Sequence, residues 1–374
     1  MPCLPPRDLP ENADWVAIPR GPVPGSEQND GAALFRLHGR HAYLGLELIC
    51  HDDRRRLWEG LVPAAQLDGW VAGLPERLAA RLRRRLTVLE SPPPPLVLAD
   101  GRQLDLCARD QPLLMGIVNV TPDSFSDGGR FAGPEEAIAH ARALAAAGAA
   151  ILDIGGGSTR PGAEPVSVEE ELARVLPVVE ALAADGHLIS IDTRKSVVAK
   201  AALAAGAAIV NDVSAGRYDP EMAAVVAEAQ APVIVMHARG EPRTMQQDPR
   251  YDDVLLEVYQ ELAAGVRRFV EAGVRAHNIV IDPGIGFGKR VTDNLALIRA
   301  IGALHGLGRP VLLGASRKRF IRALGGAERA CERLGGSLAA AFTAAQAGVA
   351  LLRVHDVAAT AEALVVARAL ALDA

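Results

Sequence analysis

Short apolar runs alternate with longer segments of helical spacing from residue 113 onward. The runs are rich in Val, Ile and Leu, which is typical of strands buried on both faces of a parallel sheet. Nearly every run stops at a polar side chain, as NIVIDPG does at Asp282 and PVIVMH does at His237. The polar residues at these predicted strand ends are Asn119, Asp153, Asp192, Asn211, Asp212, His237, Asp282, Ser316, Arg317, Lys318, Arg353, His355 and Asp356.

The segments between the runs carry Ala, Leu and Glu at the spacing of helices. They span about residues 134–148, 168–184, 195–205, 220–230, 254–273, 293–305, 333–347 and 357–372. Eight strand-then-helix units in about 260 residues come close to the roughly 250 residues of a (β/α)8 barrel. The pattern therefore predicts an α/β fold, a (β/α)8 TIM barrel, whose strand ends bring their polar side chains to one mouth.

An open doubly wound sheet also alternates strands and helices. Three features of the chain favour the barrel over this alternative. The number of units is eight, no unit carries a complete dinucleotide fingerprint, and the polar strand ends occur in all the units instead of gathering at one switch point. The polar strand ends are therefore expected to surround one pocket.

Residues 1–110 lack the regular alternation and are richer in Pro, Trp and Arg. We expect an N-terminal extension over 1–110, a small accessory domain, followed by a catalytic barrel over 111–374. GRHAYLGLELI (39–49) predicts a strand, and the proline run after Ser91 predicts a stiff boundary. The Asp100-Gly101 pair between apolar stretches predicts a hairpin turn, which we expect to plug the bottom of the barrel.

LPERLAARLRRRL (74–86) predicts a helix with leucines on one stripe and five arginines elsewhere. A basic helix of this kind is one way to bind RNA, a membrane or an acidic partner. The alternative is a leucine face docked on the protein and a solvated arginine face. The second interpretation is favoured because the rest of the region is not basic.

The composition is that of an ordinary globular enzyme: 374 residues, 49% hydrophobic, 23% charged and net charge −5. A mildly acidic chain gives no electrostatic reason to expect nucleic acid as a partner. The four cysteines form no C-x-x-C pair, which predicts a reducing, cytoplasmic location. The proline-rich N-terminus lacks the apolar core of a signal peptide, and no apolar run reaches the length of a membrane span.

Two glycine-rich stretches imitate nucleotide-binding loops. DPGIGFGKR (282–290) has Pro283 where a phosphate loop needs its first Gly, and Arg290 where it needs Ser or Thr. GGGSTRPG (155–162) has Arg160 at the last glycine of a dinucleotide motif. Both stretches are better interpreted as flexible backbone that lets a ligand come close.

Eight motifs then follow one another in a fixed order. They are LMGIVNVTPDSFSDGG (114–129), DIGGGSTRPGAEPVSVEEE (153–171), SIDTRK (190–195), IVNDVSAG (209–216), VMHARGEPRTMQ (235–246), IDPGIGFGK (281–289), GASRKRFI (314–321) and RVHDV (353–357). In that order and spacing, they resemble the dihydropteroate synthase family over about residues 112–372. The resemblance implies a TIM-barrel transferase of folate synthesis, a target of sulfonamides. Its expected reaction joins 4-aminobenzoate to 6-hydroxymethyl-7,8-dihydropterin diphosphate, giving dihydropteroate and diphosphate.

The flat edge of a pterin presents donors and acceptors that carboxylate and amide side chains match in one plane. Asp282, Asp192 and Asn211 match the family's pterin contacts, and strand-end capping is the alternative interpretation of each. Lys318 matches the family lysine near the pterin carbonyl and the reacting centre. It and Arg317 are otherwise plain surface charges.

The 4-aminobenzoate site is expected around Phe287, Ser316 and Lys318, as the resemblance implies. The loops 120–133 and 156–166, rich in Gly, Pro and Ser, are expected to close over the mouth and to help form this site.

A diphosphate leaving group requires positive charge and hydrogen-bond donors. Arg353 and His355 lie two apart at a strand end, so both side chains point the same way. Thr159 adds a hydroxyl and Arg160 a further cation. Asn119 matches the family residue that helps hold Mg²⁺, and a turn residue before Thr121-Pro122 is its alternative interpretation.

The implied mechanism is electrophilic, with attack by the aniline nitrogen on a cation-like methylene. The motif order carries no evident nucleophile–base pair, since His237 and Ser214 follow different strands and no acid is placed for them. By resemblance the enzyme is expected to be a homodimer. One departure from the family pattern is Gly157, which stands where the family commonly has Glu, so a carboxylate that could order loop 156–166 is lost and backbone freedom is gained.

Two other functions are compatible with parts of these motifs. A pterin-binding methyltransferase shares the barrel and the pterin acids but has no diphosphate to hold, so it does not require the Ser-Arg-Lys and Arg-x-His cations. A catalytically silent pterin-binding paralogue needs only Asp192, Asn211 and Asp282. The presence of both cationic motifs favours the synthase.

Overall fold

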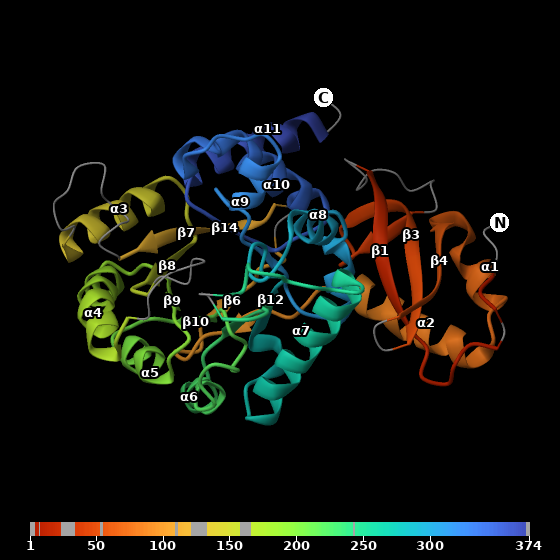
Figure 1. Ribbon diagram of the computed structural model, residues 1–374, viewed down its shortest axis with the longest axis horizontal. Coiled ribbons are helices and arrows are strands. Elements are labelled where there is room, and N and C mark those ends of the chain that lie inside the picture. The colour runs from red at the N-terminus through yellow and green to blue at the C-terminus, as the bar shows by residue number, and fades with distance from the viewer. Residues whose placement is uncertain are drawn as a thin grey trace.

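The computed structural model describes residues 4–6, 8–23, 34–52, 55–108, 111–120, 133–157, 166–241 and 244–371. Its larger part is a parallel sheet of eight strands with helices around it (Figure 1). The strands are β7 (Leu113–Asn119), β8 (Ile151–Gly155), β9 (Ile189–Asp192), β10 (Ile209–Asp212), β11 (Val233–Met236), β12 (Ile279–Asp282), β13 (Leu312–Leu313) and β14 (Leu351–Val354). A parallel bridge between Ile281 and Val311 joins β12 to the segment before β13 and closes the sheet into a barrel.

Each strand is followed by a helix on the outside of the barrel. In chain order these are α3 (Pro134–Ala146), α4 (Val168–Ala184), α5 (Ser196–Ala204), α6 (Met222–Ala229), α7 (Val254–Glu271), α8 (Val291–Arg299), α10 (Leu334–Gln346) and α11 (Val357–Ala371). The 3-10 helix η4 (Ile301–Leu307) extends α8, and the short helices α9 (Arg319–Ala323) and η5 (Ala330–Glu332) precede α10. The predicted α/β barrel is confirmed, and its strand ends meet at one mouth because all eight strands run parallel.

Within the described residues, no helix combines the length and the apolar character that crossing a bilayer requires.

A second sheet forms at the N-terminal end of the chain. It contains β1 (Asp14–Val23), β2 (Phe35–Leu37), β3 (His41–Asp52) and β4 (Arg55–Pro63), all antiparallel to their neighbours. The helices η2 (Ala64–Gln66), α1 (Leu67–Ala72) and α2 (Glu76–Glu90) follow it. We call residues 8–90 the N-terminal module.

Strand β1 is buried on both faces because it lies between two cores. Trp15 and Ala17 belong to the core of the N-terminal module, whereas Val16 and Ile18 pack into the core of the barrel. Successive side chains of a strand point to opposite faces, so one strand serves both cores. In Figure 1 the N-terminal module accordingly lies against the side of the barrel, next to α7 and α8.

Helix α2 buries Leu78 and Leu82 as its leucine stripe predicted. The expected solvated arginine face is wrong for three of the five arginines. Arg77, Arg81 and Arg85 are four residues apart and donate to the backbone carbonyls of Leu9, Ala13 and Trp15, respectively. They take these partners because residues i and i+4 share one helix face and β1 with its leading segment runs along that face.

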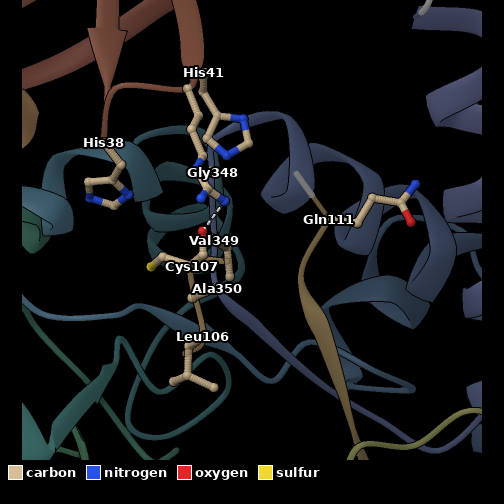
Figure 2. A pocket seen from close by; sticks show the side chains of 9 residues that line it. His38, His41, Leu106, Cys107, Gln111, Gly348, Val349 and Ala350 are labelled. Atoms are coloured by element: carbon tan, nitrogen blue, oxygen red, sulfur yellow. Dashed lines mark hydrogen bonds between the residues drawn. The ribbon is translucent and has the colours of Figure 1, made fainter. Parts of the chain in front are cut away.

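The end of the barrel opposite the mouth is covered by a two-stranded hairpin of β5 (Leu96–Val97) and β6 (Gln103–Leu104). Leu96, Leu98 and Leu106 pack against residues of the barrel strands. The N-terminal module meets this end of the barrel at a small pocket that includes His38, His41, Cys107 and Gly348 (Figure 2). There Arg40 donates to the carbonyl oxygen of Cys107 and joins the two parts of the chain.

Candidate active site

The centre of the barrel mouth is a half-buried arginine held by two acids. Arg353, on β14, donates from Nε to Asp153 on β8 at 2.6 Å and from Nη2 to Asp192 on β9 at 2.7 Å. Burial alone lowers the pKa of a guanidinium, but Asp153 and Asp192 more than offset this and raise the pKa of Arg353 above its usual value. Arg353 is therefore a permanent cation with a fixed orientation.

The same acids retain unused acceptors. Asp153 Oδ1 and Asp192 Oδ1 are buried and have no hydrogen-bond partner among the described residues. Asn211, on β10, donates from Nδ2 to Asp153 Oδ2 at 3.1 Å and is itself buried. Burial is the main cause of a raised pKa at Asp192. A buried acceptor without a partner costs free energy. The unpaired oxygens of Asp153 and Asp192 therefore suit a ligand that brings hydrogen-bond donors.

Asp282 and Lys318 lie next to Arg353 and its two acids. Asp282 closes β12 and accepts the Gly284 backbone N–H on Oδ1 at 2.7 Å. A Cβ built on Gly314 would lie 3.7 Å from Asp282 Oδ2 and 3.8 Å from both Lys318 Nζ and Arg353 Cβ, so these three residues surround one point. Burial lowers the pKa of Lys318 to about 8, although Asp282 acts in the opposite direction. Burial likewise raises the pKa of Asp282.

The loop after β12 contributes the neighbours of Lys318. Lys318 Nζ donates to the carbonyl oxygen of Ile285 and lies 4.8 Å from the centre of the Phe287 ring. A cation over an aromatic face is attracted by the ring quadrupole, so the ammonium has an ordered position.

Ser316 and His355 form a contact that the motif order did not predict. Ser316 Oγ is 3.0 Å from His355 Nδ1 and accepts the His355 backbone N–H at 3.2 Å. The contact forms because two strand ends that are 39 positions apart in the chain meet at the mouth. The two bonds tie the β13 loop to β14.

The turn at Arg317 is fixed on both sides. Arg317 has φ +58°, a left-handed conformation that non-glycine residues seldom adopt. Its guanidinium makes two hydrogen bonds to Asp356, and its backbone N–H donates to Ser337. Arg317 is therefore not the plain surface charge that was its alternative interpretation. Its contacts hold Ser316 and Lys318 on either side of the turn.

Of the remaining predicted site residues, only Asn119 lies within the described residues. Asn119 closes β7, is half-buried and lies opposite Gly155 of β8. Thr159 and Arg160, and most of the loops 120–133 and 156–166, lie outside the described residues. Among the described residues, no group of three or more His, Cys, Asp or Glu side chains is arranged to hold a metal ion.

Gly157 lies beside a buried carboxylate. A Cβ built on Gly157 would be 3.4 Å from Glu171 Oε2 of α4, which already pairs with Lys195 at 2.7 Å. Thr193 donates to the other oxygen of Glu171 at 2.6 Å. A glutamate at position 157 would therefore bring a second negative charge next to Glu171.

Two buried residues near the mouth were missed as site residues in the sequence. Asp153 was recognised only as a polar strand end, although a charged residue inside a fully apolar run signals a buried ion pair. Lys289 lies in DPGIGFGKR (282–290), to which the sequence gives only the role of flexible backbone, yet it is buried and contacts His237. Ser214 bonds to Asp212, so His237 and Ser214 do not form a pair.

Comparison with known proteins identifies relatives of the barrel. A family model described as "Pterin binding enzyme" matches residues 115–355. A dihydropteroate synthase of Escherichia coli is 45% identical over 274 residues, which cover 73% of this chain and 95% of the relative. That of Mycobacterium leprae is 49% identical over 257 residues, covering 67% of this chain and 90% of the relative.

Solved structures give the same result. The dihydropteroate synthase of Xanthomonas albilineans with 4-aminobenzoic acid superimposes with a TM-score of 0.69 at 49% identity, covering 75% of this chain and 99% of that one. The same enzyme in complex with 7,8-dihydropteroate gives a TM-score of 0.67 at 47% identity, covering 75% and 100%. The family match begins at residue 115, so the N-terminal module lies outside it.

Proposed function

Because this chain belongs to the dihydropteroate synthases of the pterin-binding enzyme family, we propose that the charged cluster around Arg353 binds the pterin substrate and directs release of its diphosphate. The enzyme condenses 6-hydroxymethyl-7,8-dihydropterin diphosphate with 4-aminobenzoate and gives 7,8-dihydropteroate and diphosphate. The observation that carries the assignment of the site is the charged cluster of Arg353, Asp192, Asp282 and Lys318 at the strand ends.

The pterin edge is recognised by side chains with acceptors to offer. Asp282 uses Oδ1 for Gly284, which leaves Oδ2 for the 2-amino and N3–H donors of the ring. Asp192 Oδ1 is a second free buried acceptor, and Asn211 lies beside it on the neighbouring strand. A carboxylate facing two donors forms the stronger, charge-assisted kind of hydrogen bond.

Arg353 and His355 stabilise the leaving diphosphate. A guanidinium has five N–H donors, and Asp153 and Asp192 use two of them, so three are left for phosphate oxygens. Departure of the diphosphate leaves the methylene carbon electron-poor, and a fixed cation close to the leaving group lowers the barrier to this step. Because Asp153 already orients Arg353, no reorganisation is required when charge develops.

Lys318 lies between the two substrates. Its ammonium points to the pterin carbonyl side of the site and packs over Phe287, which with Ser316 forms one wall of the aminobenzoate site. Thr159 and Arg160, which lie outside the described residues, are proposed to give the diphosphate a hydroxyl donor and a further cation. The aniline nitrogen of 4-aminobenzoate attacks the methylene carbon and then loses a proton to solvent or to diphosphate.

The protein side chains could hold a magnesium ion only together with oxygen atoms of the bound substrate. Asn119 offers one amide oxygen, and Mg²⁺ prefers six oxygen ligands, so diphosphate oxygens and water would make up the rest. Bound there, Mg²⁺ would neutralise charge on the leaving diphosphate.

Residues 1–110 are proposed to be an accessory domain on a catalytic barrel of residues 111–374. The barrel is proposed to form a homodimer. Support comes from the large apolar side chains that α10 and α11 expose, namely Leu334, Phe342, Val365, Val366 and Leu370. A cytoplasmic location is proposed because the described cysteines Cys50, Cys107 and Cys331 are free thiols, which fits a reducing compartment.

Complementation tests the proposed function. The full chain should restore growth without folate end products to a bacterial strain whose own synthase gene is deleted. The Asp282→Asn variant at equal expression should not. Purified protein should form dihydropteroate only when both substrates are present, and failure of the wild-type chain in both assays would refute the function.

A further inference from the structure

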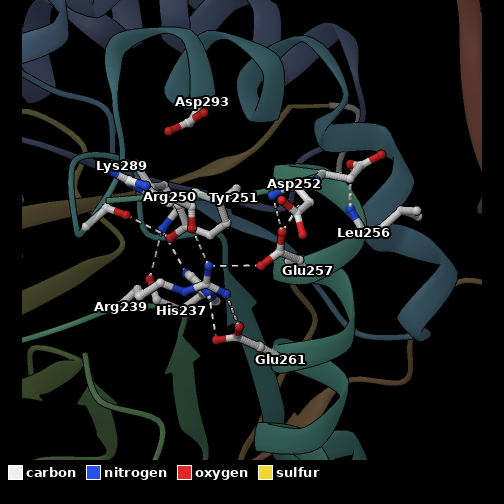
Figure 3. A network of polar contacts seen from close by, with 12 residues as sticks. His237, Arg239, Arg250, Tyr251, Asp252, Leu256, Glu257, Glu261, Lys289 and Asp293 are labelled. Carbon is white, nitrogen blue, oxygen red and sulfur yellow. Dashed lines mark hydrogen bonds and ion pairs between the residues drawn. The ribbon is translucent and has the colours of Figure 1, made fainter. Parts of the chain in front are cut away.

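A chain of ionic and hydrogen-bonding contacts runs from the N-terminal module to the active-site loop after β12. Figure 3 shows most of it, between α7 and the end of β11. We call these side chains the α7 network; its members are Arg56, Asp253, Glu257, Arg239, Glu261, His237 and Lys289.

The network begins at the first turn of α7. Asp253 is the N-cap of this helix, and its Oδ1 accepts the backbone N–H groups of Leu255 and Leu256 at 3.0 and 3.1 Å. Its Oδ2 pairs with Arg56 of β4. A side chain of the N-terminal module therefore holds the residue that starts a barrel helix.

Arg239 connects this turn to the rest of α7. Glu257 accepts the backbone N–H of Asp253 at 3.1 Å on one oxygen and pairs with Arg239 at 2.9 Å on the other. Arg239 also bonds to Glu261 and lies 4.0 Å from the centre of the Tyr251 ring. Its guanidinium is thus fixed by two carboxylates and one aromatic face.

The far end of the network is a buried lysine. Glu261 is 3.1 Å from His237 Nε2, and Lys289 Nζ is 2.8 Å from His237 Nδ1. Burial raises the pKa of Glu261, but His237 and Arg239 outweigh it and lower that pKa to about 2, so the ionised carboxylate accepts a hydrogen bond from the Nε2–H of His237. Nδ1 is then the acceptor for Lys289.

Lys289 fastens the loop after β12. Its Nζ donates to the carbonyl oxygens of Gly284 at 3.0 Å and Phe287 at 3.1 Å. The loop also lies directly on the backbone after β11. Gly284 and Gly288 have φ +65° and +62°, and a Cβ on them would lie 1.9 Å from His237 O and 2.1 Å from Arg239 O. This loop carries Ile285 and Phe287, the two contacts of Lys318.

We propose that the N-terminal module holds the substrate loop of the barrel in place, and that Arg56 is the positioning residue through which it does so. Loss of Arg56 leaves the carboxylates of Asp253 and Glu257 beside one cation fewer, which loosens the first turn of α7 and then Arg239. A loop that must be ordered by the substrate binds it more weakly. The inference rests on the proposed roles of Lys318 and Phe287, and it gives the accessory module a task in substrate binding.

The test compares two neighbouring arginines in the full chain. Arg56→Ala removes the contact with Asp253, whereas Arg55→Ala removes an arginine that is 75% exposed and pairs with Asp52 inside the module. We expect KM for the pterin substrate to rise about threefold in Arg56→Ala, the scale of a partly exposed ion pair, with little change in kcat. Arg55→Ala should match the wild type, and Arg56→Lys should recover part of the loss.

Hydrogen exchange separates this effect from general destabilisation. The amides of residues 284–288 should exchange faster in Arg56→Ala than in Arg55→Ala, while the amides of β7 and β8 remain unchanged. Asp253→Asn, which keeps a capping side chain but weakens the ion pair, should behave like Arg56→Ala. Equal KM values and equal exchange in both arginine variants, with an active wild-type enzyme, would overturn the inference and leave the proposed function intact.

Discussion

Arg353 is held at 2.6 Å by Asp153, a fully buried carboxylate that precedes it by 200 positions in the chain. Asp192 takes another of its N–H groups. An arginine on an isolated strand end has many rotamers, whereas this one has a single orientation toward the mouth of the barrel. The pair therefore explains how one side chain supplies a fixed positive charge to the site.

Asp153→Asn is the direct test of that pair. The change keeps the shape but removes the charge, and weakening a buried ion pair can cost about 3–5 kcal/mol. We expect kcat/KM to fall about 100-fold or more in steady-state kinetics. Asp212→Asn is the matched control, because Asp212 is equally buried at a strand end but bonds to Ser214 and Gly216. An equal loss in both variants would mean that burial, and not Arg353, is what matters.

Asp282→Asn tests recognition of the pterin edge. The amide puts donors against the donors of the ring, and a mismatched buried group costs roughly 1–3 kcal/mol. Affinity for the pterin diphosphate should fall tenfold or more. Isothermal titration calorimetry measures this, with circular dichroism to verify folding. Wild-type affinity in the variant would rule out the assignment of Asp282.

The lowered pKa of Lys318 predicts where kcat/KM declines at alkaline pH. Its pKa is lowered to about 8, so its charge is complete below that pH and is lost as pH rises through it. Since kcat/KM reports the free enzyme, it should decline above about pH 8. Lys318→Arg keeps the charge at all these pH values and should move the decline upward, even at a lower rate. A decline that stays near pH 8 in this variant would assign it to another group.

The lowered pKa of His305, which lies where the N-terminal module meets the barrel, predicts that the protein loses stability in acid. Its ring lies 4.8 Å from that of His38, and burial lowers its pKa to about 4. The unfolded chain takes up this proton near pH 6.5, so stability is complete above that pH and falls as pH decreases toward 4. Lowering the pH from 7 to 5 should reduce the free energy of unfolding of both proteins. The reduction should be roughly 1–2 kcal/mol smaller in His305→Asn than in the wild type.

Urea titrations at pH 7 and pH 5 measure this difference. His187→Asn, at a half-buried position on the turn between α4 and β9, is the control variant. Similar pH sensitivity in wild type and His305→Asn would contradict the prediction.

The exposed face of α10 and α11 predicts self-association. Val366 is 52% exposed on α11, and Leu370 is 84% exposed one turn later. We expect the wild-type protein to sediment as a dimer and Val366→Glu as a monomer, because a charge would be buried without a partner. Val197→Glu on α5, at a position 56% exposed, should leave the dimer intact. A monomeric wild type would refute the homodimer.

The order of strands and helices was predictable because it depends on local periodicity. Runs such as NIVIDPG read as buried strands in any context, and eight of them joined by helices leave few topologies besides a barrel. The positions of Asp282, Lys318 and Arg353 at the mouth followed from their place at strand ends. The strand 39–49 and the leucine stripe of α2 were predictable for the same reason.

Partnerships between distant residues were decided by the tertiary structure. Asp153 meets Arg353, and Ser316 meets His355, only because the closed sheet brings β8, β13 and β14 to one mouth. Burial, which sets the pKa of Lys318, depends on the same packing. No local pattern distinguishes an arginine that faces solvent from one that meets a carbonyl, so the contacts of Arg81 with Ala13 and of Arg56 with Asp253 were beyond the sequence. Periodicity records which face of an element is buried, whereas the partner of a polar side chain depends on what the rest of the chain places against it.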